Sequence, residues 1–340
     1  MSTINVSSVK DTNGNNNVLI NGALIKPGSL DPENKIINGS FDIWQYGTSQ
    51  ILAGYRSASR WTTLSSNLAT STKQMPFALG ETLGKNNPKY FLRHTATNQT
   101  TTSDYSGVGQ KIENVSSYAG QTITVLGWAR RYYGSGYLGV EAMQVFGTGG
   151  SPALTGISPT KILLSENWEP FAVVMDIPSV INRTIGTADH HMRITFWASA
   201  GSDYNERFDN LGNQEIGIDL WGIHIKVGSH TIDACNDYVA PDISLETQKC
   251  YRYYYEKTIG ASHTYLYSVG IQSFMYWRRQ NFPVPMRKTP TVSVTTPTYV
   301  NSSDLSAGAN DNLSWWERVA ASAAGRYDIT GYTIKFDAEL

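Results

Sequence analysis

The chain has 340 residues, of which 40% are hydrophobic, 11% aromatic and only 16% charged, with a formal net charge of −1. A near-neutral chain without a run of like charges lacks the basic surface needed to bind a phosphate backbone, so we expect no contact with nucleic acid. No stretch of about 18 apolar residues occurs, and the N-terminus has no basic end followed by an apolar segment. We therefore expect neither membrane insertion nor a signal peptide.

Residues 1–35 are expected to form an N-terminal arm. The polar run NGNNN is followed by VLINGALI, which predicts a short strand, and Pro27-Gly28 ends the segment. A segment of this size cannot bury a core of its own. The arm must pack on a partner or on copies of itself, or stay unfolded.

From residue 36 to about 240, short alternating segments between turn clusters predict a β-sandwich. Side chains of a strand alternate between its two faces, so each segment has one face for the core. The expected sets that share a face are Ile123 with Val125, Leu126 with Trp128, Met192 with Ile194 and Phe196, and Trp221 with Ile223, Ile225 and Val227. We expect Trp44, Trp61, Trp128, Trp197 and Trp221 to fill the core rather than to stack on sugars.

Residues 241–340 predict a linker helix followed by a smaller β domain. The segment DISLETQKCYRYYYEK favours a helix, with Ser244 as its cap and Glu246 near its positive end. The tyrosines of that segment are expected on the helix as packing residues. Near the C-terminus, GYTIKFDAEL places Tyr332, Ile334 and Phe336 on one face of a strand. The only cysteines, Cys235 and Cys250, fit no zinc pattern and are expected as buried thiols.

Several segments occur in one order along the chain and carry a family resemblance. They are IINGSFDIWQYGTS (36–49), SRW (59–61), VGQKIENVSSYAGQTITVLGWAR (108–130), QVFGTGGSP (144–152), ENWEPFAVVMDIPSV (166–180), RITFWASAG (193–201), IDLWGIHIKVGSHT (218–231), ETQKCYRYYYEK (246–257), NFPVPMRKTPTVSV (281–294) and FDAEL (336–340). Together they resemble a family of tailed-bacteriophage structural proteins, including tail fibres, head fibres and minor virion proteins, built on a carbohydrate-binding-module-like jelly roll.

The resemblance implies an all-β virion protein with three parts: an anchoring arm (1–35), a jelly roll (36–240), and a linker helix with a C-terminal β domain (241–340). It also implies a homotrimer, assembled in the host bacterial cytoplasm and exposed on the extracellular particle, whose arm binds another virion protein of the tail or capsid. The expected function is adsorption to the host surface through a glycan. The alternative is a structural head fibre, capsid decoration or tail adaptor without receptor binding.

Two clusters of aromatic and basic residues are candidates for glycan binding. The first surrounds a glycine turn and contains Arg130, Arg131, Tyr132, Tyr133 and Tyr137. Phenol rings can stack on sugars, and guanidinium groups supply hydrogen-bond donors. A loop at a subunit interface would have the same composition, so both interpretations stay open.

The second cluster, in the C-terminal domain, contains Tyr276, Trp277 and Arg278. It has the same two interpretations, and the interface is slightly favoured.

Metal and catalytic sites receive less support from the sequence. The resembled carbohydrate-binding modules often hold a structural calcium ion, so oxygens of Asn38, Asp42 or Asp219 are weak candidates for such a site. No other cofactor is expected. The chain has no G-x-S-x-G elbow, no phosphate-binding loop and no β-helix repeat. We therefore expect no enzymatic activity.

Overall fold

The computed structural model describes residues 34–66, 70–259, 263–265, 275–295, 298–300, 302–321 and 327–340, together with the backbone of two short paired strands, β1 (Val18–Ile20) and β2 (Ala23–Ile25). The chain divides into two compact units, Met1–Ile243 and Ser244–Leu340. Apart from the β1–β2 pairing, the expected arm lies outside the described residues up to position 33. Among the described helices, none is both long and apolar enough to cross a membrane.

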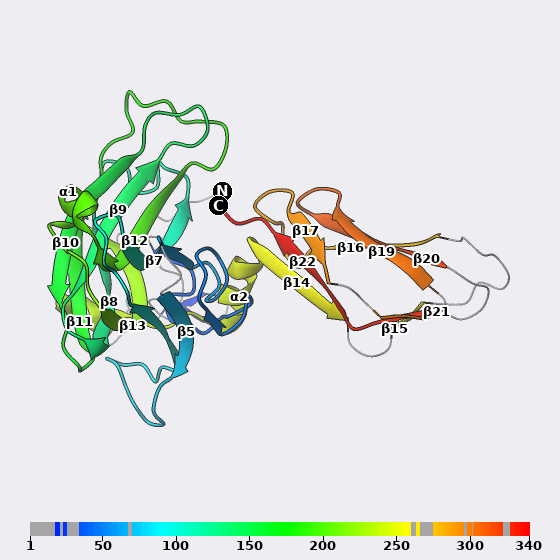
Figure 1. Ribbon diagram of the computed structural model, residues 1–340, viewed down its shortest axis with the longest axis horizontal. Helices are drawn as coiled ribbons and strands as arrows, with labels where there is room; N and C mark the ends of the chain where they lie inside the picture. Colours follow the sequence, from blue (N-terminus) through cyan, green and yellow to red (C-terminus); the bar gives the residue numbers. More distant parts are fainter. Residues whose placement is uncertain are drawn as a thin grey trace. The chain divides into compact units, whose positions relative to one another are not determined.

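The first unit contains two antiparallel sheets that form a sandwich (Figure 1). The five-stranded sheet has the order β10-β9-β12-β7-β4, with β10 (Leu154–Leu163), β9 (Tyr137–Val145), β12 (His191–Ala200), β7 (Tyr105–Glu113) and β4 (Thr62–Ser65). The six-stranded sheet has the order β11-β8-β13-β6-β5-β3, with β11 (Glu169–Asp176), β8 (Thr122–Gly134), β13 (Ile216–Val227), β6 (Tyr90–Ala96), β5 (Thr70–Pro76) and β3 (Ser49–Gln50). The expected all-β class is confirmed.

Successive strands pass back and forth between the two sheets, as in a jelly roll. The chain moves from β6 in the six-stranded sheet to β7 in the five-stranded sheet, then to β8 and back to β9. After the β9–β10 hairpin, β11, β12 and β13 again alternate between the sheets. The remaining elements of this unit are short: η1 (Ser202–Tyr204), α1 (Asn205–Phe208) and η2 (Ile232–Asp237).

Alternating apolar side chains from the two sheets meet in one core. Ile123 and Val125 of β8 and Ile194 and Phe196 of β12 belong to the same buried cluster, as their spacing predicts. On the opposite face of β8, Leu126 joins a second cluster that covers the outer surface of the six-stranded sheet. Four of the five tryptophans expected in cores, Trp61, Trp128, Trp197 and Trp221, are buried, and Trp44 packs partly buried against the main core.

A chain of hydrogen-bonded polar side chains crosses the sandwich core. Thr63 of β4 bonds Thr72 of β5 at 2.9 Å, Thr72 bonds Nδ1 of His94 at 3.0 Å, and Nε2 of His94 bonds Ser106 of β7 at 2.8 Å. All four residues are buried. Because buried polar groups are costly unless they are paired, this chain of bonds fixes the two sheets against each other.

The prediction that Trp221 shares a strand face with Ile223 and Ile225 is wrong. The sequence alternation places it with Ile223 and Ile225, but Trp221 packs in the outer cluster while the two isoleucines lie in the main core. The pairing of β13 with β8 shifts between Trp221 and His224, and Gly222 has a φ of +66°. This β-bulge reverses the alternation within the strand, and such a reversal is invisible to a count of period two.

The second unit begins with a helix that is shorter than expected. Helix α2 runs over Ile243–Tyr251, so Tyr251 ends it, while Tyr254 and Tyr255 lie on strand β14 (Tyr254–Ile259). The prediction that all the tyrosines of this segment lie on the helix is therefore wrong. Tyr253 and Tyr254 are buried, and Tyr255 packs on Phe336, so the aromatic density reflects the core of this unit.

Three small sheets make up the rest of the second unit. Their orders are β14-β22-β17, β15-β21-β18 and β16-β20-β19, with β22 (Tyr332–Asp337), β17 (Thr291–Val294), β15 (His263–Tyr265), β21 (Tyr327–Thr330), β18 (Thr298–Val300), β16 (Met275–Asn281), β20 (Ser314–Ala321) and β19 (Ser302–Ala309). Tyr332, Ile334 and Phe336 share one buried cluster, as expected. Cys235 and Cys250 are both buried and neither belongs to a disulfide, which confirms the expectation of two buried thiols.

Candidate glycan-binding site

The turn from β8 to β9 carries the first predicted cluster of tyrosines and arginines. Gly134 has a φ of +69° and Gly136 of +147°, conformations that side chains other than glycine adopt with strain. The side chain of Gln214 fixes the start of β9: its Oε1 accepts the Tyr137 N–H at 2.8 Å, and its Nε2 donates to the Tyr137 carbonyl at 2.9 Å. The turn is therefore held in one shape.

Three phenol rings are exposed around this turn, namely Tyr132 at 40%, Tyr133 at 46% and Tyr137 at 40%. The Tyr132 ring is stacked on Arg93, whose guanidinium carbon lies 3.6 Å from the ring centre. The hydroxyl of Tyr132 also bonds Thr95. For Tyr137, the Lys161 ammonium lies 5.4 Å from the ring centre. We call these three tyrosines, with Arg130 and Arg131, the Arg/Tyr surface.

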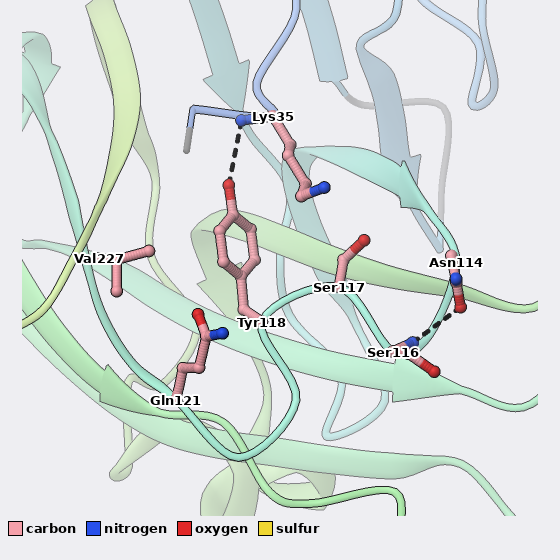
Figure 2. Close-up of a pocket in the computed structure, with 7 residues that line it drawn as sticks. All are labelled: Lys35, Asn114, Ser116, Ser117, Tyr118, Gln121 and Val227. Carbon is pink, nitrogen blue, oxygen red and sulfur yellow. Dashed lines mark hydrogen bonds between the residues drawn. The ribbon is translucent and has the colours of Figure 1, made fainter. Parts of the chain in front are cut away.

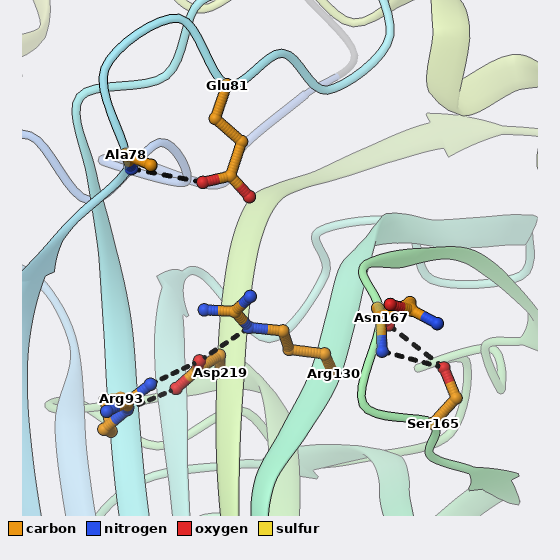
Figure 3. Close-up of polar contacts among 7 residues, drawn as sticks. All are labelled: Ala78, Glu81, Arg93, Arg130, Ser165, Asn167 and Asp219. Carbon is orange, nitrogen blue, oxygen red and sulfur yellow. Dashed lines mark hydrogen bonds and ion pairs between the residues drawn. The ribbon is translucent and has the colours of Figure 1, made fainter.

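Arg130 belongs to a buried ion cluster beside the tyrosines. Figure 3 shows Arg93 and Arg130 pointing at Asp219, whose carboxylate is fully buried; the three donor–acceptor distances are 2.7 Å and 2.8 Å from Arg93 and 2.9 Å from Arg130. Asp219 holds the pKa of Arg93 above its ordinary value. The Arg130 guanidinium also lies 4.7 Å from the ring centre of Trp168. Arg130 is thus a structural residue whose side chain keeps 25% exposure.

Arg131 is about as exposed as Arg130, with 26% of its side chain accessible. Its Nη2 lies 3.1 Å from the exposed Glu166 carboxylate, and its Nη1 donates to the Gly134 carbonyl at 2.8 Å. An exposed ion pair contributes little to stability and can be exchanged for another partner. Arg131 can therefore exchange Glu166 for a ligand placed at this turn.

The weak calcium candidates Asn38 and Asp219 both bind other groups of the protein. Both oxygens of Asp219 accept guanidinium hydrogens from Arg93 and Arg130. The amide of Asn38 closes its own loop, donating to the carbonyls of Ile43 and Ser59 at 2.8 Å and 3.0 Å. Across the described ranges, no group of three or more His, Cys, Asp or Glu side chains could hold a metal ion.

The second predicted cluster does not form one surface. Trp277 and Arg278 are neighbours on β16, so their side chains leave opposite faces of the strand. Trp277 is 51% exposed and packs 5.1 Å from Trp316, whereas Arg278 lies 3.6 Å from the fully buried carboxylate of Glu317. The side chain of Tyr276 lies outside the described residues. A single ligand cannot meet Trp277 and Arg278 together.

Two hollows in the first unit were not expected from the sequence. One, of about 590 Å³, is lined by Asp42, Lys85, Asn86, Asn87, Lys89 and Tyr90, among others. Burial raises the pKa of Asp42, against opposing effects of Ser40 and Lys89. The side-chain amide of Asn86 donates to the Tyr238 carbonyl and accepts the Ala240 N–H. These partners are 152 and 154 positions away along the chain, so no local sequence pattern predicts the contact.

The other hollow is shallow and polar. It has a volume of about 450 Å³ and is lined by hydroxyl and amide side chains from residues 114–121 beside Lys35 (Figure 2). Its floor includes Tyr118, whose hydroxyl accepts the backbone N–H of Lys35 at 3.0 Å. No charged side chain other than Lys35 lines it.

No protein-family model and no curated protein matches the chain. Among solved structures, it is similar to the enzymatically active domain of bacteriophage CBA120 tailspike protein 4, with 10% identity, a TM-score of 0.33, and coverage of 57% of this chain and 21% of that one. A family 4 carbohydrate-binding module gives 16% identity and a TM-score of 0.33 over 56% of this chain and 98% of the other. The xylan-binding domain from Paenibacillus barcinonensis gives 10% identity and a TM-score of 0.32, over 54% of this chain and 94% of the other. All these scores lie below 0.5, and we transfer no property of these proteins to this chain.

Proposed function

We propose that this chain is a glycan-binding appendage protein of a bacteriophage virion and that the Arg/Tyr surface contacts the host. The observation that carries the glycan part is the exposure of Tyr132, Tyr133 and Tyr137 around a turn that is held rigid from beneath. The Tyr132 ring is exposed yet held by Arg93 and Thr95, and a ring that is already held loses little conformational entropy on binding. That property suits recognition of a saccharide better than filling of a core.

The chemistry of the surface fits a sugar. An aromatic face packs on the apolar face of a pyranose, and a phenol hydroxyl can bond its hydroxyl groups. Arg131 adds donors at the edge of the rings. A single such contact is weak, so we propose a homotrimer, in which linked sites raise the overall avidity.

The virion part of the proposal is supported by the resemblance of the ordered sequence segments to those of tailed-phage structural proteins. In this proposal residues 1–35 bind another virion protein, of the tail or the capsid. Particles assembled with a chain that lacks residues 1–35 should lose the protein, whereas the truncated chain should still form trimers. Normal copy numbers on such particles would refute the anchoring part.

A glycan array probed with the full-length protein tests the glycan part, together with pull-down of host cells. We expect binding to a restricted set of saccharides and no release of reducing ends on prolonged incubation, because we propose binding without catalysis. If the folded trimer bound no saccharide at millimolar concentration, the structural alternative, a head fibre, decoration or adaptor protein, would replace this proposal. Production of reducing ends would show an enzyme instead.

A further inference from the structure

The strands β16, β20 and β19 form one sheet of the second unit (Figure 1), and one face of this sheet carries two tryptophans and two arginines. Trp277 on β16 lies opposite Arg318 on β20, and two residues along the strand Arg279 lies opposite Trp316. Residues that lie opposite each other, or two apart on one strand, point to the same side of a sheet. The four side chains therefore share one face, which we call the Trp/Arg face.

The other face of this sheet belongs to the core of the second unit. Trp315 and Val319 of β20 lie in its buried cluster. Glu317 points to the same side, where its carboxylate accepts the Tyr332 hydroxyl at 3.0 Å and lies 3.6 Å from Nη1 of Arg278. Glu317 is fully buried, so its carboxylate has its partners on the core side of the sheet.

The two arginines of the Trp/Arg face have no acidic partner among the described residues. Arg279 is exposed, and its guanidinium makes neither a hydrogen bond nor an ion pair with a described residue. Arg318 donates from Nε to Ser306 at 3.2 Å, and its guanidinium carbon lies 5.6 Å from the ring centre of Trp277. Asp304, the acidic residue of β19, is exposed and forms an ion pair with neither arginine. Two positive charges on this face are therefore available to a ligand.

The two indole rings offer a contact area beside these charges. Trp277 is 51% exposed, and its ring centre lies 5.1 Å from that of Trp316. Trp316 lies over Gly308 of β19, where a β-carbon would come within 2.7 Å of the indole ring. An exposed ring that is already packed against a neighbour loses little conformational entropy when a ligand covers it.

We propose that the Trp/Arg face binds an acidic saccharide and that Arg279 and Arg318 pair with the carboxylates of its uronic acid units. A guanidinium group matches a planar carboxylate through two parallel hydrogen bonds, and an exposed indole offers stacking area for a sugar ring. The carboxylate of a uronic acid is attached directly to the sugar ring. A sugar stacked on Trp277 therefore brings its charge to the arginines of the same face.

Two other occupants fit the Trp/Arg face less well. A second copy of the chain that met it face to face would bring arginine against arginine, and such like-charge contacts are costly. A nucleic-acid strand carries a charge on every phosphate and needs a longer basic track than two arginines. The face lies in the second unit, so the proposal does not rest on the Arg/Tyr surface of the first unit.

Calorimetric titration of the full-length protein with trigalacturonate tests the proposal, with the uncharged trimethyl ester as the comparison ligand. We expect the acid to bind at least roughly tenfold more tightly than the ester, because only the acid forms charge-assisted hydrogen bonds with guanidinium groups. Arg279→Gln should remove most of that preference, whereas Trp277→Ala should weaken the binding of both ligands. Equal binding of acid and ester, or unchanged binding of the acid by Arg279→Gln, would overturn the proposal.

Lys335→Gln is the matched control for the loss of one positive charge. Lys335 is exposed on β22, in another sheet of the same unit, and Lys335→Gln should bind trigalacturonate as wild type does. A loss equal to that of Arg279→Gln would show a diffuse effect of charge and contradict the proposal. Arg279→Gln also carries the test if Trp277→Ala does not fold, because the Arg279 guanidinium has no described partner to lose.

Three further measurements distinguish the Trp/Arg face from other sites and occupants. The variant Tyr132→Ala/Tyr133→Ala/Tyr137→Ala should bind trigalacturonate as wild type; loss of binding would place the acid on the Arg/Tyr surface and overturn this inference while leaving the proposed function intact. Light scattering should give the same mass for Arg279→Gln and Trp277→Ala as for wild type, and a smaller mass would show instead an interface between copies. Oligothymidylate should bind more weakly than trigalacturonate, and tighter binding that Arg279→Gln removed would show a nucleic-acid surface instead.

Discussion

The ring of Tyr132 lies against Gly217, at a place where a β-carbon on residue 217 would collide with the ring edge. The same ring is stacked on Arg93 from the neighbouring strand. The position of the exposed Tyr132 ring is thus set by Gly217 on β13, which has no side chain, and by the Arg93 guanidinium on β6. The Arg/Tyr surface therefore depends on residues that lie outside it.

Gly217→Ala should displace Tyr132 from its slot. Overpacking of this kind costs about 1–3 kcal/mol of unfolding free energy, and the glycan affinity should fall as well. Urea unfolding and a glycan titration measure the two effects. In a Tyr132→Ala background the same change should cost much less, because the ring it collides with has gone. An equal cost in both backgrounds would show that the glycine is required for another reason.

Asp219→Asn should destabilise the first unit strongly. It leaves Arg93 and Arg130 without the carboxylate they share, and breaking a buried ion pair costs about 3–5 kcal/mol. Asp237→Asn is the control, since Asp237 is 64% exposed, and it faces Lys85 at 4.0 Å. This change should cost less than about 1 kcal/mol. Similar losses for both variants in urea unfolding would contradict the structural role given to Asp219.

His94 should make the stability depend on pH in acid. Burial lowers its pKa from 6.5 to about 3, so between these values the unfolded chain binds a proton that the folded chain does not. The free energy of unfolding should therefore fall as the pH falls through this window, by up to about 1.4 kcal/mol per pH unit. His94→Gln should remove that part of the slope.

His191→Gln is the matched comparison for this experiment. The pKa of His191 is lowered only to about 4, so its contribution ends at a higher pH. The difference between the two variants should appear between about pH 4 and pH 3. Identical unfolding curves for His94→Gln and wild type across the acid range would exclude a neutral buried His94.

The thiol of Cys235 should be inert in the folded chain. It donates to the Phe171 carbonyl at 3.3 Å, and burial raises its pKa to about 11. Since the thiolate is the reactive form, a Cys250→Ser chain should react with a thiol reagent at pH 8 far more slowly when folded than in urea. Rapid labelling of the folded variant would show that the segment around residue 235 opens readily.

Local periodicity was sufficient to predict the class of fold. The spacing of Ile123 and Val125, and of Met192 and Ile194, predicts which face of each strand is buried. In the structure all four side chains lie in the main core, as predicted. It failed at Trp221, where the bulge at Gly222 inserts a residue, and after Tyr251, where aromatic residues suit a strand as well as a helix. The first failure lies where one residue changes the backbone geometry, and the second lies where the residue types fit both kinds of structure.

The candidate site was less accessible to sequence reasoning. Exposed tyrosines beside the glycine turn could be identified because Arg131 to Tyr137 are close in the chain. The partner of Arg130 could not, because Arg130 and Asp219 are 89 positions apart and meet only across paired strands.

The central claim is that the exposed tyrosines bind a host glycan. The most direct measurement is the affinity of the full-length protein for its best saccharide from the array, compared between wild type, Tyr132→Ala/Tyr133→Ala/Tyr137→Ala, and a Tyr90→Ala control in the hollow beside Asn86. Loss of a stacked ring costs about 1 kcal/mol or more, so the triple variant should bind at least roughly tenfold more weakly while Tyr90→Ala binds normally. Unchanged affinity in a correctly folded triple variant would contradict the claim.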